Sequence, residues 1–144
     1  MIKTFIVKSF GFEASHQLPN HDGKCRNLHG HSYKMEVILQ GDLNTDAGSP
    51  KEGMVVDFGE VSAIVKELII ERLDHRFLAK GDEQVDVPEE QVMMLGVRTT
   101  AENIAEWILN NLRETALRDY ISGIRLWETD SGRAEVHVSS RSLI

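Results

Sequence analysis

Three histidines in the first third of the chain have the spacing of metal ligands. His29 and His31 are two residues apart, so in an extended segment their side chains lie on the same face. His16 ends the preceding extended segment, and no fourth protein ligand is evident. Structural zinc sites usually have four protein ligands, whereas catalytic sites keep one position open. The pattern favours a catalytic Zn²⁺ site, and three ordinary strand histidines are the alternative.

A cysteine that could be reactive lies in the same region. Cys25 is the only cysteine of the chain and stands in a polar loop, with Lys24 and Arg26 on either side. Adjacent cations favour the thiolate over the thiol, so we expect a reactive side chain beside the metal. A fourth zinc ligand and an inert buried cysteine are the alternatives.

A histidine next to a carboxylate, at Asp74-His75, offers this thiol a partner for proton transfer. The aspartate would fix the tautomer and orientation of the imidazole, which could then act as acid or base. The same pair would also suit the end of a helix, where the helix dipole stabilises a protonated histidine. Both interpretations stay open at this point.

Two glutamates complete the set of candidate functional residues. Glu128 shares strand parity with the apolar Ile124 and Leu126, so it faces the same side as they do. A carboxylate on an apolar face needs a partner, and a ligand with two neighbouring N–H donors would suit it; a strand-end glutamate turned to solvent is the alternative. Glu102 follows Thr99 with the Thr-x-x-Glu spacing of a capping box, which is its simpler explanation.

The elements that must position these residues follow from the apolar periodicity. In chain order we expect a strand over 2–16, a polar loop over 17–28, a strand over 31–41, a helix from 57 to about 75, a helix from 99 or 100 to about 116, and a hairpin of strands over 123–129 and 133–139. This β-β-α-α-β-β order predicts an α+β fold, an antiparallel sheet with both helices on one face. The first two strands would bring the three histidines together.

Local patterns add three expectations. Phe5 and Val7 have the opposite parity to Phe10 and Phe12, which predicts a bulge near residues 8 and 9. The first helix should begin with a capping box made by the residues at positions 57 and 60. Residues 79–98 form an acidic linker, within which 92–97 could be a short strand.

Composition limits the function classes. A chain of 144 residues should form a single domain, 1–144, and its formal charge of -7 argues against a nucleic-acid-binding face. No apolar run approaches the roughly 20 residues of a membrane span, and a single cysteine cannot form an internal disulfide. We expect a cytoplasmic protein. The open face and edges of so small a sheet need cover, which favours assembly.

Six short motifs together resemble one known family. They are Phe-Glu-Ala-Ser-His16, Cys25-x-x-x-His29-Gly-His31, Val-Asp57-Phe58, Leu-Asp74-His75, Thr100-Ala-Glu102-Asn103 and Trp-Glu128-Thr129. In this order they resemble the 6-pyruvoyl-tetrahydropterin synthase family, and the spacing of Cys25 and His29 resembles its bacterial, 6-carboxytetrahydropterin-forming branch. One departure is Arg98-Thr99, since relatives often have proline before the threonine.

The resemblance implies the tunnelling fold (T-fold), in which sheets of three subunits form a barrel and two trimers stack as a hexamer. It assigns Zn²⁺ to the three histidines, and a proton relay to Cys25, Asp74 and His75 that is assembled across a subunit interface. Glu128 would anchor a pterin ring, and Thr100 and Glu102 would line its pocket.

The implied substrate is 7,8-dihydroneopterin triphosphate, and the implied product is 6-carboxy-5,6,7,8-tetrahydropterin, a precursor of queuosine-type 7-deazaguanines. No nucleic acid or membrane partner is expected. Lys24, Arg26 and Arg98 are candidates for binding the triphosphate. The alternatives are formation of 6-pyruvoyl-tetrahydropterin on the same fold, a non-catalytic zinc- or pterin-binding module, and a cupin-like barrel, which would lack the two helices in mid-chain.

Overall fold

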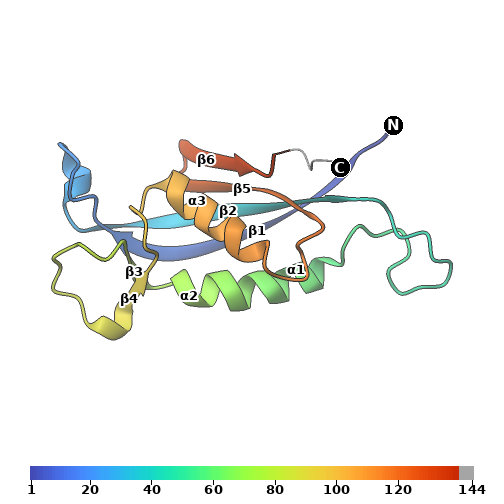
Figure 1. Cartoon of the computed structure of the whole chain (residues 1–144), viewed down its shortest axis with the longest axis horizontal. Coiled ribbons are helices and arrows are strands. Elements are labelled where there is room, and N and C mark those ends of the chain that lie inside the picture. The colour runs from blue at the N-terminus through green and yellow to red at the C-terminus, as the bar shows by residue number, and fades with distance from the viewer. Residues whose placement is uncertain (140–144) are drawn as a thin grey trace.

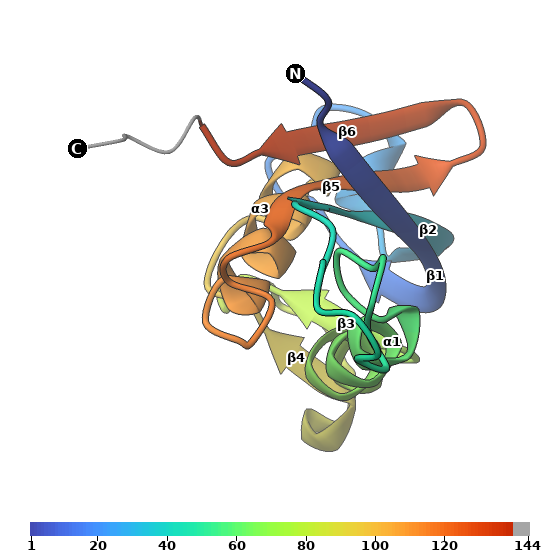
Figure 2. The same cartoon turned by 90° about the vertical axis from the view of Figure 1, so that its right-hand side faces the viewer.

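A curled six-stranded sheet carries both helical segments on one face (Figures 1 and 2). The structure, a computed structural model, describes residues 1–139. Its strands are β1 (Thr4–His16), β2 (His29–Gly41), β3 (Arg76–Ala79), β4 (Val92–Met94), β5 (Ile121–Thr129) and β6 (Gly132–His137). Its helices are α1 (Phe58–Val65), which continues through a π-helical segment (Lys66–Ile70) into α2 (Glu71–Leu73), and α3 (Ala101–Leu112). The predicted α+β class is confirmed.

The sheet is mixed, not purely antiparallel as predicted. Its order is β4-β3-β1-β2-β5-β6, and the four strands β1, β2, β5 and β6 pair antiparallel. β3 and β4 lie in the stretch between the two helices and pair in parallel, β3 with β1 and β4 with β3. β3 was missed because it has only four residues and begins only two residues after the end of the helix. β4 confirms the short strand expected near position 92.

β1 and β2 form a long hairpin whose far end carries the histidines. They pair without a shift over all 13 residues of β1, ending with His16 opposite His29. The predicted bulge near residues 8 and 9 is wrong. Unbroken alternation instead turns Phe5 and Val7 to the face away from the helices, where both are exposed. That face therefore presents apolar side chains to its surroundings.

A wide turn in the first helical segment keeps one row of side chains on the core. Val61, Val65, Ile69 and Leu73 are four residues apart and fully buried. An α-helix has 3.6 residues per turn, so a strict four-residue spacing would drift around its axis. The π-helical segment has a wider turn and absorbs this drift. The helix thus ends with a core residue, and Asp74 follows at once beside β1.

The helix N-termini only partly follow the predicted capping pattern. The carboxylate of Asp57 accepts a hydrogen bond from the amide of Gly59 at 2.7 Å, whereas Glu60 forms an ion pair with Lys51 and does not complete the predicted box. At the start of α3, the cap is Thr100 and not the residue before it.

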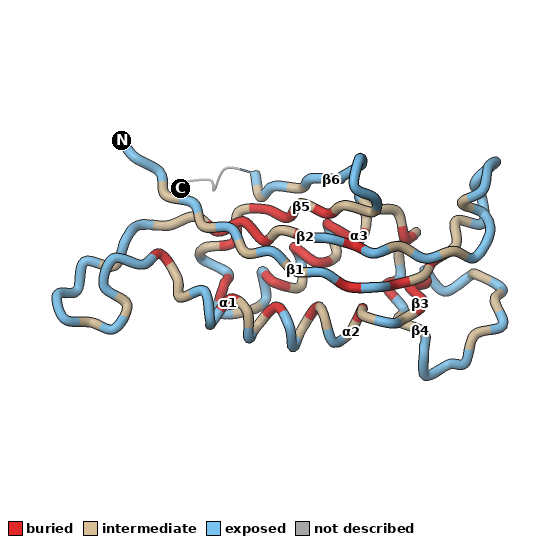
Figure 3. Tube along the Cα trace, turned by 180° about the vertical axis from the view of Figure 1, so that it is seen from behind, coloured by how far each residue is buried: buried red, intermediate tan, exposed pale blue. Residues whose placement is uncertain are grey.

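The core fills the space between the sheet and the helices. In Figure 3 the buried segments gather in the middle of the molecule, while the loops at both ends are exposed. No helix within residues 1–139 has the length and apolar character needed to cross a membrane.

Candidate metal centre and adjoining pockets

The end of the β1–β2 hairpin brings the three predicted histidines together. Nε2 of His16 lies 2.9 Å from Nε2 of His29 and 3.1 Å from Nε2 of His31. The three rings meet edge to face, with centroids 4.5, 4.9 and 5.0 Å apart. The prediction that a hairpin gathers these side chains is confirmed, and their nitrogens are close enough to hold one metal ion.

Backbone carbonyls behind the cluster fix the tautomers of two of these rings. Nδ1 of His16 donates to the carbonyl of Thr99 at 2.7 Å, and Nδ1 of His29 donates to the carbonyl of Asn27, also at 2.7 Å. A carbonyl can only accept, so the proton resides on Nδ1 in both rings. Each Nε2 then presents a lone pair toward the centre, as metal ligation requires.

Burial favours the neutral form, which binds metals, in two of the three rings. His16 is 1% exposed, and this desolvation lowers its pKa to about 4. Burial also lowers the pKa of His31, although the negative charge of Glu128 works in the opposite direction. Neutral imidazoles need not lose a proton when a metal binds. A donor set of three imidazole nitrogens suits Zn²⁺.

Glu128 reaches the same centre from β5. Its Oε1 lies 3.6 Å from Nε2 of His16 and 3.9 Å from Nε2 of His31. The side chain thus faces the helices, like Ile124 and Leu126, as its strand parity predicted. Its position next to the metal ligands was not foreseen, because strand parity gives the face of a residue but not its depth.

A cavity of about 400 Å³ opens beside this glutamate. It is lined by the start of α3 and the β5–β6 turn and includes both Glu102 and Glu128. Thr100, the third residue expected there, does not line it. Its hydroxyl accepts the amide hydrogen of Asn103 at 3.2 Å and caps α3. Thr100 therefore shapes this cavity indirectly, by setting where the helix starts.

Asp74 and His75 are held on β1 by a pair of backbone hydrogen bonds. The amide of Glu13 donates to Oδ1 of Asp74 at 2.8 Å, and the amide of His75 donates to the carbonyl of Glu13 at 2.5 Å. Oδ2 of Asp74 lies 2.9 Å from Nδ1 of His75. The bond from Glu13, followed by the contacts with His75, lowers the pKa of Asp74. The aspartate is therefore a fixed anion beside the imidazole.

His75 has an unusual backbone and an exposed ring. Its φ of 58° is the only positive value among the non-glycine residues of the described chain, and such conformations cluster at functional sites. The side chain is 78% exposed. It lines a second cavity, of about 610 Å³, to which His29 and His31 also contribute.

Cys25 is not brought to either group within one chain. It lies half-buried in a 3-10 turn over Lys24–Arg26, and its thiol has no hydrogen-bond partner among residues 1–139. It lines neither of the two cavities. The structure thus assembles the histidines with Glu128 and places His75 on the cavity that His29 and His31 line, whereas Cys25 lines neither cavity.

Charged residues near these cavities differ from those expected. The guanidinium of Arg98 donates two hydrogen bonds to the carboxylate of Asp82, at 3.0 and 2.9 Å, and lies 3.7 Å from the carboxylate of Glu83. Its charge is therefore already neutralised. Arg76, not singled out in the sequence, lines the cavity that contains His75. Arg76 begins β3, a strand too short to be recognised from the sequence, and no local pattern distinguished it from other surface cations.

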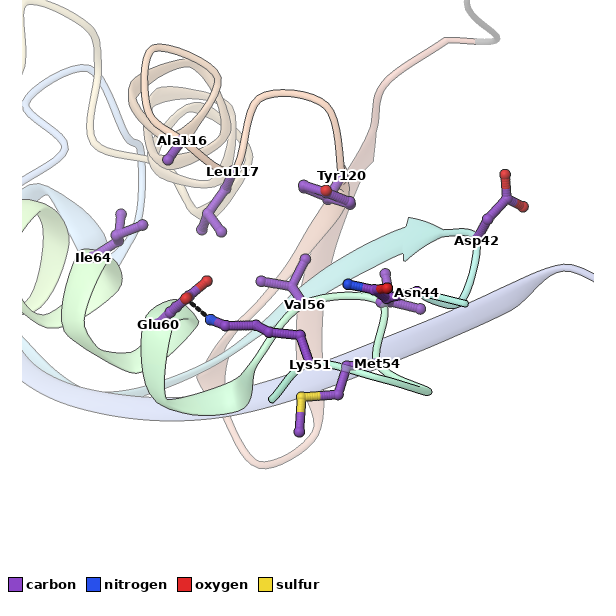
Figure 4. A pocket seen from close by; sticks show the side chains of 11 residues that line it. Asp42, Asn44, Lys51, Met54, Val56, Glu60, Ile64, Ala116, Leu117 and Tyr120 are labelled. Carbon is purple, nitrogen blue, oxygen red and sulfur yellow. Dashed lines mark ion pairs between the residues drawn. The ribbon is translucent and has the colours of Figure 1, made fainter. Parts of the chain in front are cut away.

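A further cavity, of about 340 Å³, lies at the opposite end of the molecule, between the 42–56 loop and the turn after α3 (Figure 4). Its walls include Val56, Leu117 and Tyr120, and the ion pair of Lys51 with Glu60 spans it. None of the predicted functional residues lies there.

Comparisons with known proteins agree with this geometry. The protein-family model described as 6-pyruvoyl tetrahydropterin synthase matches residues 5–138. The chain is 42% identical over 141 residues to the 6-carboxy-5,6,7,8-tetrahydropterin synthase of Haemophilus influenzae, covering 90% of this chain and 96% of that protein. A Synechocystis protein of the same name is 40% identical over 113 residues, covering 78% and 77%.

The fold also has solved counterparts. The crystal structure of 6-pyruvoyl tetrahydropterin synthase from Plasmodium vivax superposes with a TM-score of 0.76 at 21% identity, covering 96% of this chain and 99% of that one. At this identity the likeness shows the fold, which is the predicted T-fold. On the match of nearly its whole length, the chain belongs to the 6-pyruvoyl tetrahydropterin synthase family.

Proposed function

We propose that this protein is a zinc-dependent 6-carboxy-5,6,7,8-tetrahydropterin synthase. It would convert 7,8-dihydroneopterin triphosphate and one water molecule into 6-carboxy-5,6,7,8-tetrahydropterin, acetaldehyde and triphosphate. The observation that carries the proposal is the convergence of three imidazole Nε2 atoms beside the carboxylate of Glu128, at the wall of a cavity. The names of its two bacterial relatives support this choice of reaction.

His16, His29 and His31 would hold the zinc ion. Bound zinc supplies a Lewis acid that lowers the pKa of hydroxyl groups on the substrate side chain. The backbone partners of His16 and His29 keep the rings oriented, so that little reorganisation is needed when the ion binds.

Glu128 would orient the substrate. A carboxylate can accept two parallel N–H bonds, and the pterin ring offers such a pair at its 2-amino group and N3. Glu102 lies on the wall of the same cavity and would contact the ring from the start of α3. Thr100 would contribute through the position of that helix. Fixing the ring in this way places the side-chain carbons near the metal.

Cys25 and His75 would move protons at those carbons, with Asp74 orienting the imidazole. As the side chain is oxidised the ring is reduced, so no external redox cofactor is required. Within one chain Cys25 does not line the cavity that includes His75, and the ring of His75 is exposed. These facts support a relay completed by a neighbouring subunit. Lys24, Arg26 and Arg76 are the candidate cations for the triphosphate.

We further propose a homohexamer built from two trimers whose sheets form barrels. Exposed Phe5 and Val7 on the face away from the helices support burial of that face by other subunits. A cytoplasmic location and a role in 7-deazaguanine precursor synthesis complete the proposal. No nucleic acid or membrane partner is part of it.

Product analysis tests the reaction. Incubation of the zinc-loaded protein with 7,8-dihydroneopterin triphosphate should yield 6-carboxytetrahydropterin and acetaldehyde by mass spectrometry. The family-model name and the Plasmodium vivax neighbour favour one second candidate, 6-pyruvoyl-tetrahydropterin formation. A product that retains the three-carbon side chain would establish that second candidate. Binding of substrate and zinc without turnover would instead identify a binding module.

A further inference from the structure

The carboxylate of Glu128 lies within reach of the metal position as well as of the cavity. Ligand atoms of a tetrahedral zinc ion are roughly 3.3 Å apart, as zinc–nitrogen distances of about 2.0–2.1 Å require. Nε2 of His16 is 2.9 and 3.1 Å from those of His29 and His31. Oε1 of Glu128 is 3.6 and 3.9 Å from Nε2 of His16 and of His31. Its carboxylate therefore lies beside two of the three histidines, and a shift toward the centre of the cluster would make it a fourth ligand.

The polar surroundings of Glu128 call for a cation. Among residues 1–139, its only ion-pair partners are the Nε2 atoms of His16 and His31. The Nδ1 hydrogen of His16 is used by the Thr99 carbonyl, so its Nε2 presents a lone pair and cannot donate to the carboxylate. A carboxylate that faces a lone pair is stabilised when a positive ion lies between them.

Glu128 also stands at the boundary between the metal centre and the cavity. It lies near the end of β5, where the pairing with β6 shifts register between Trp127 and Thr129. Its side chain is 30% exposed and lines the cavity that Glu102 shares. A change of rotamer at this strand end would turn the carboxylate from the histidines toward the cavity.

We infer that Glu128 is an exchangeable fourth ligand of the metal. Without a pterin, its carboxylate completes the coordination begun by the three histidines. When a pterin enters, the two N–H groups of the ring bind the carboxylate and draw it off the ion, which opens the fourth position only when substrate is present. This inference rests on the proposed function for the identity of the displacing ligand. Because one carboxylate serves both purposes, a bound metal lowers the affinity for the pterin ring. A bound pterin lowers the affinity for the metal by the same factor.

Zinc affinity tests the first half of the inference. It is measured by competition with a chromophoric chelator for the wild-type chain, Glu128→Gln and Glu102→Gln. Glu128→Gln should weaken zinc binding at least about tenfold, in line with the losses seen when groups around metal sites are removed. Glu102→Gln is the matched control, since it removes the other carboxylate of the same cavity, and it should leave zinc affinity unchanged. Equal zinc affinities for wild type and Glu128→Gln would overturn the inference.

The second half is tested with pterin itself (2-amino-4-oxopteridine), which offers the ring donors but has no side-chain hydroxyl to bind the metal. Saturating pterin should weaken zinc binding in the wild type and shift the visible absorption bands of the cobalt-substituted protein. Neither change should occur in Glu128→Gln. A zinc affinity that pterin leaves unaltered in the wild type would also refute the exchange. Because no turnover is measured, these results stand apart from the product analysis that tests the proposed function.

Discussion

The imidazole of His16 donates its Nδ1 hydrogen to the backbone carbonyl of Thr99, 83 positions away, at 2.7 Å. This bond ties the end of β1 to the residue just before the cap of α3. It fixes the tautomer of one histidine of the candidate metal centre, and it also fixes the position of the helix that borders the cavity with Glu128.

The side chain of Thr99 is dispensable for this arrangement. Its hydroxyl is buried without a hydrogen-bond partner among the described residues, while its backbone carbonyl accepts the hydrogen bond from His16. Thr99→Val should therefore keep zinc affinity and raise the free energy of unfolding by up to about 1 kcal/mol, because an unpaired buried hydroxyl is removed. Urea denaturation and chelator competition measure both quantities.

Thr99→Gly is the contrasting variant. It keeps the carbonyl but frees the backbone, so both stability and zinc affinity should fall. If Thr99→Val lost zinc while Thr99→Gly kept it, the hydroxyl would have a role that its surroundings do not show.

Removing one proposed metal ligand should lower zinc binding and turnover together. His29→Ala leaves two imidazoles and the carboxylate of Glu128, which a bound pterin also draws away, so the variant should lose its zinc on dialysis. Metal content after dialysis, together with product formation, measures the effect. His21→Ala is the matched control, because the His21 side chain lies exposed in the neighbouring loop, where it contacts Gly23 and Asp22. Full zinc occupancy in His29→Ala would place the metal elsewhere.

The relay should work across subunits. Cys25→Ala and His75→Ala should each keep zinc and assembly but lose turnover. When the two inactive proteins exchange subunits, part of the activity should return, because some interfaces then join an intact Cys25 to an intact His75. Turnover of 7,8-dihydroneopterin triphosphate by the mixture measures this.

A second mixture controls the experiment. Cys25→Ala combined with His29→Ala should stay inactive, since both residues would belong to the same half of each site. Absence of recovery in the first mixture would mean that the relay forms within one chain. Full activity of Cys25→Ala alone would remove the thiol from the mechanism.

Asp74 should stabilise the fold in a pH-dependent way. Its pKa is lowered chiefly by the amide of Glu13, so its folded-state pKa lies below the unfolded-state value near 3.9. The stabilisation is complete at neutral pH and is lost as the pH falls through the unfolded-state and then the folded-state pKa. Asp74→Asn should cost about 1 kcal/mol at pH 7, less than a buried charged hydrogen bond because the side chain is 37% exposed.

Denaturation of wild type and Asp74→Asn at a series of pH values measures this contribution. The difference between the two proteins should shrink as the pH drops below about 4. Asp22→Asn, which alters a fully exposed loop carboxylate, should differ little from the wild type at any of these pH values. A constant difference between wild type and Asp74→Asn would show that the charge of Asp74 plays no part.

The histidine cluster was predictable because strand pairing is a short-range rule. Once one strand ended at His16 and the next began near His31, antiparallel pairing implied their proximity, although β2 begins two residues earlier than predicted, at His29. The α+β fold class and the positions of the two helices were predictable from the apolar periodicity, which is also a local property of the sequence. The bulge in β1 was wrong because sequence parity was read as burial on one face, whereas Phe5 and Val7 lie on the other, exposed face.

Other parts of the site depend on contacts that no local pattern records. The carbonyl of Thr99 acts through the backbone, so its side chain gives no hint of the contact with His16. The closeness of Glu128 to the histidines depends on how β5 aligns with β2. Arg98 is unavailable to a phosphate because its guanidinium is paired with Asp82. This pairing depends on the path of the long segment over residues 79–98, which has little regular structure. Each of these needs the tertiary arrangement before it can be stated.

β1 carries Glu13 and His16 three residues apart, so one strand positions both the Asp74–His75 pair and the histidine cluster. The backbone of Glu13 forms hydrogen bonds with Asp74 and His75, while the side chain of His16 points into the cluster. A one-residue slip of β1 against β2 would turn His16 to the opposite face and also displace the support of His75. An error in the register of this strand would therefore disrupt the proposed metal centre and the proposed proton relay together.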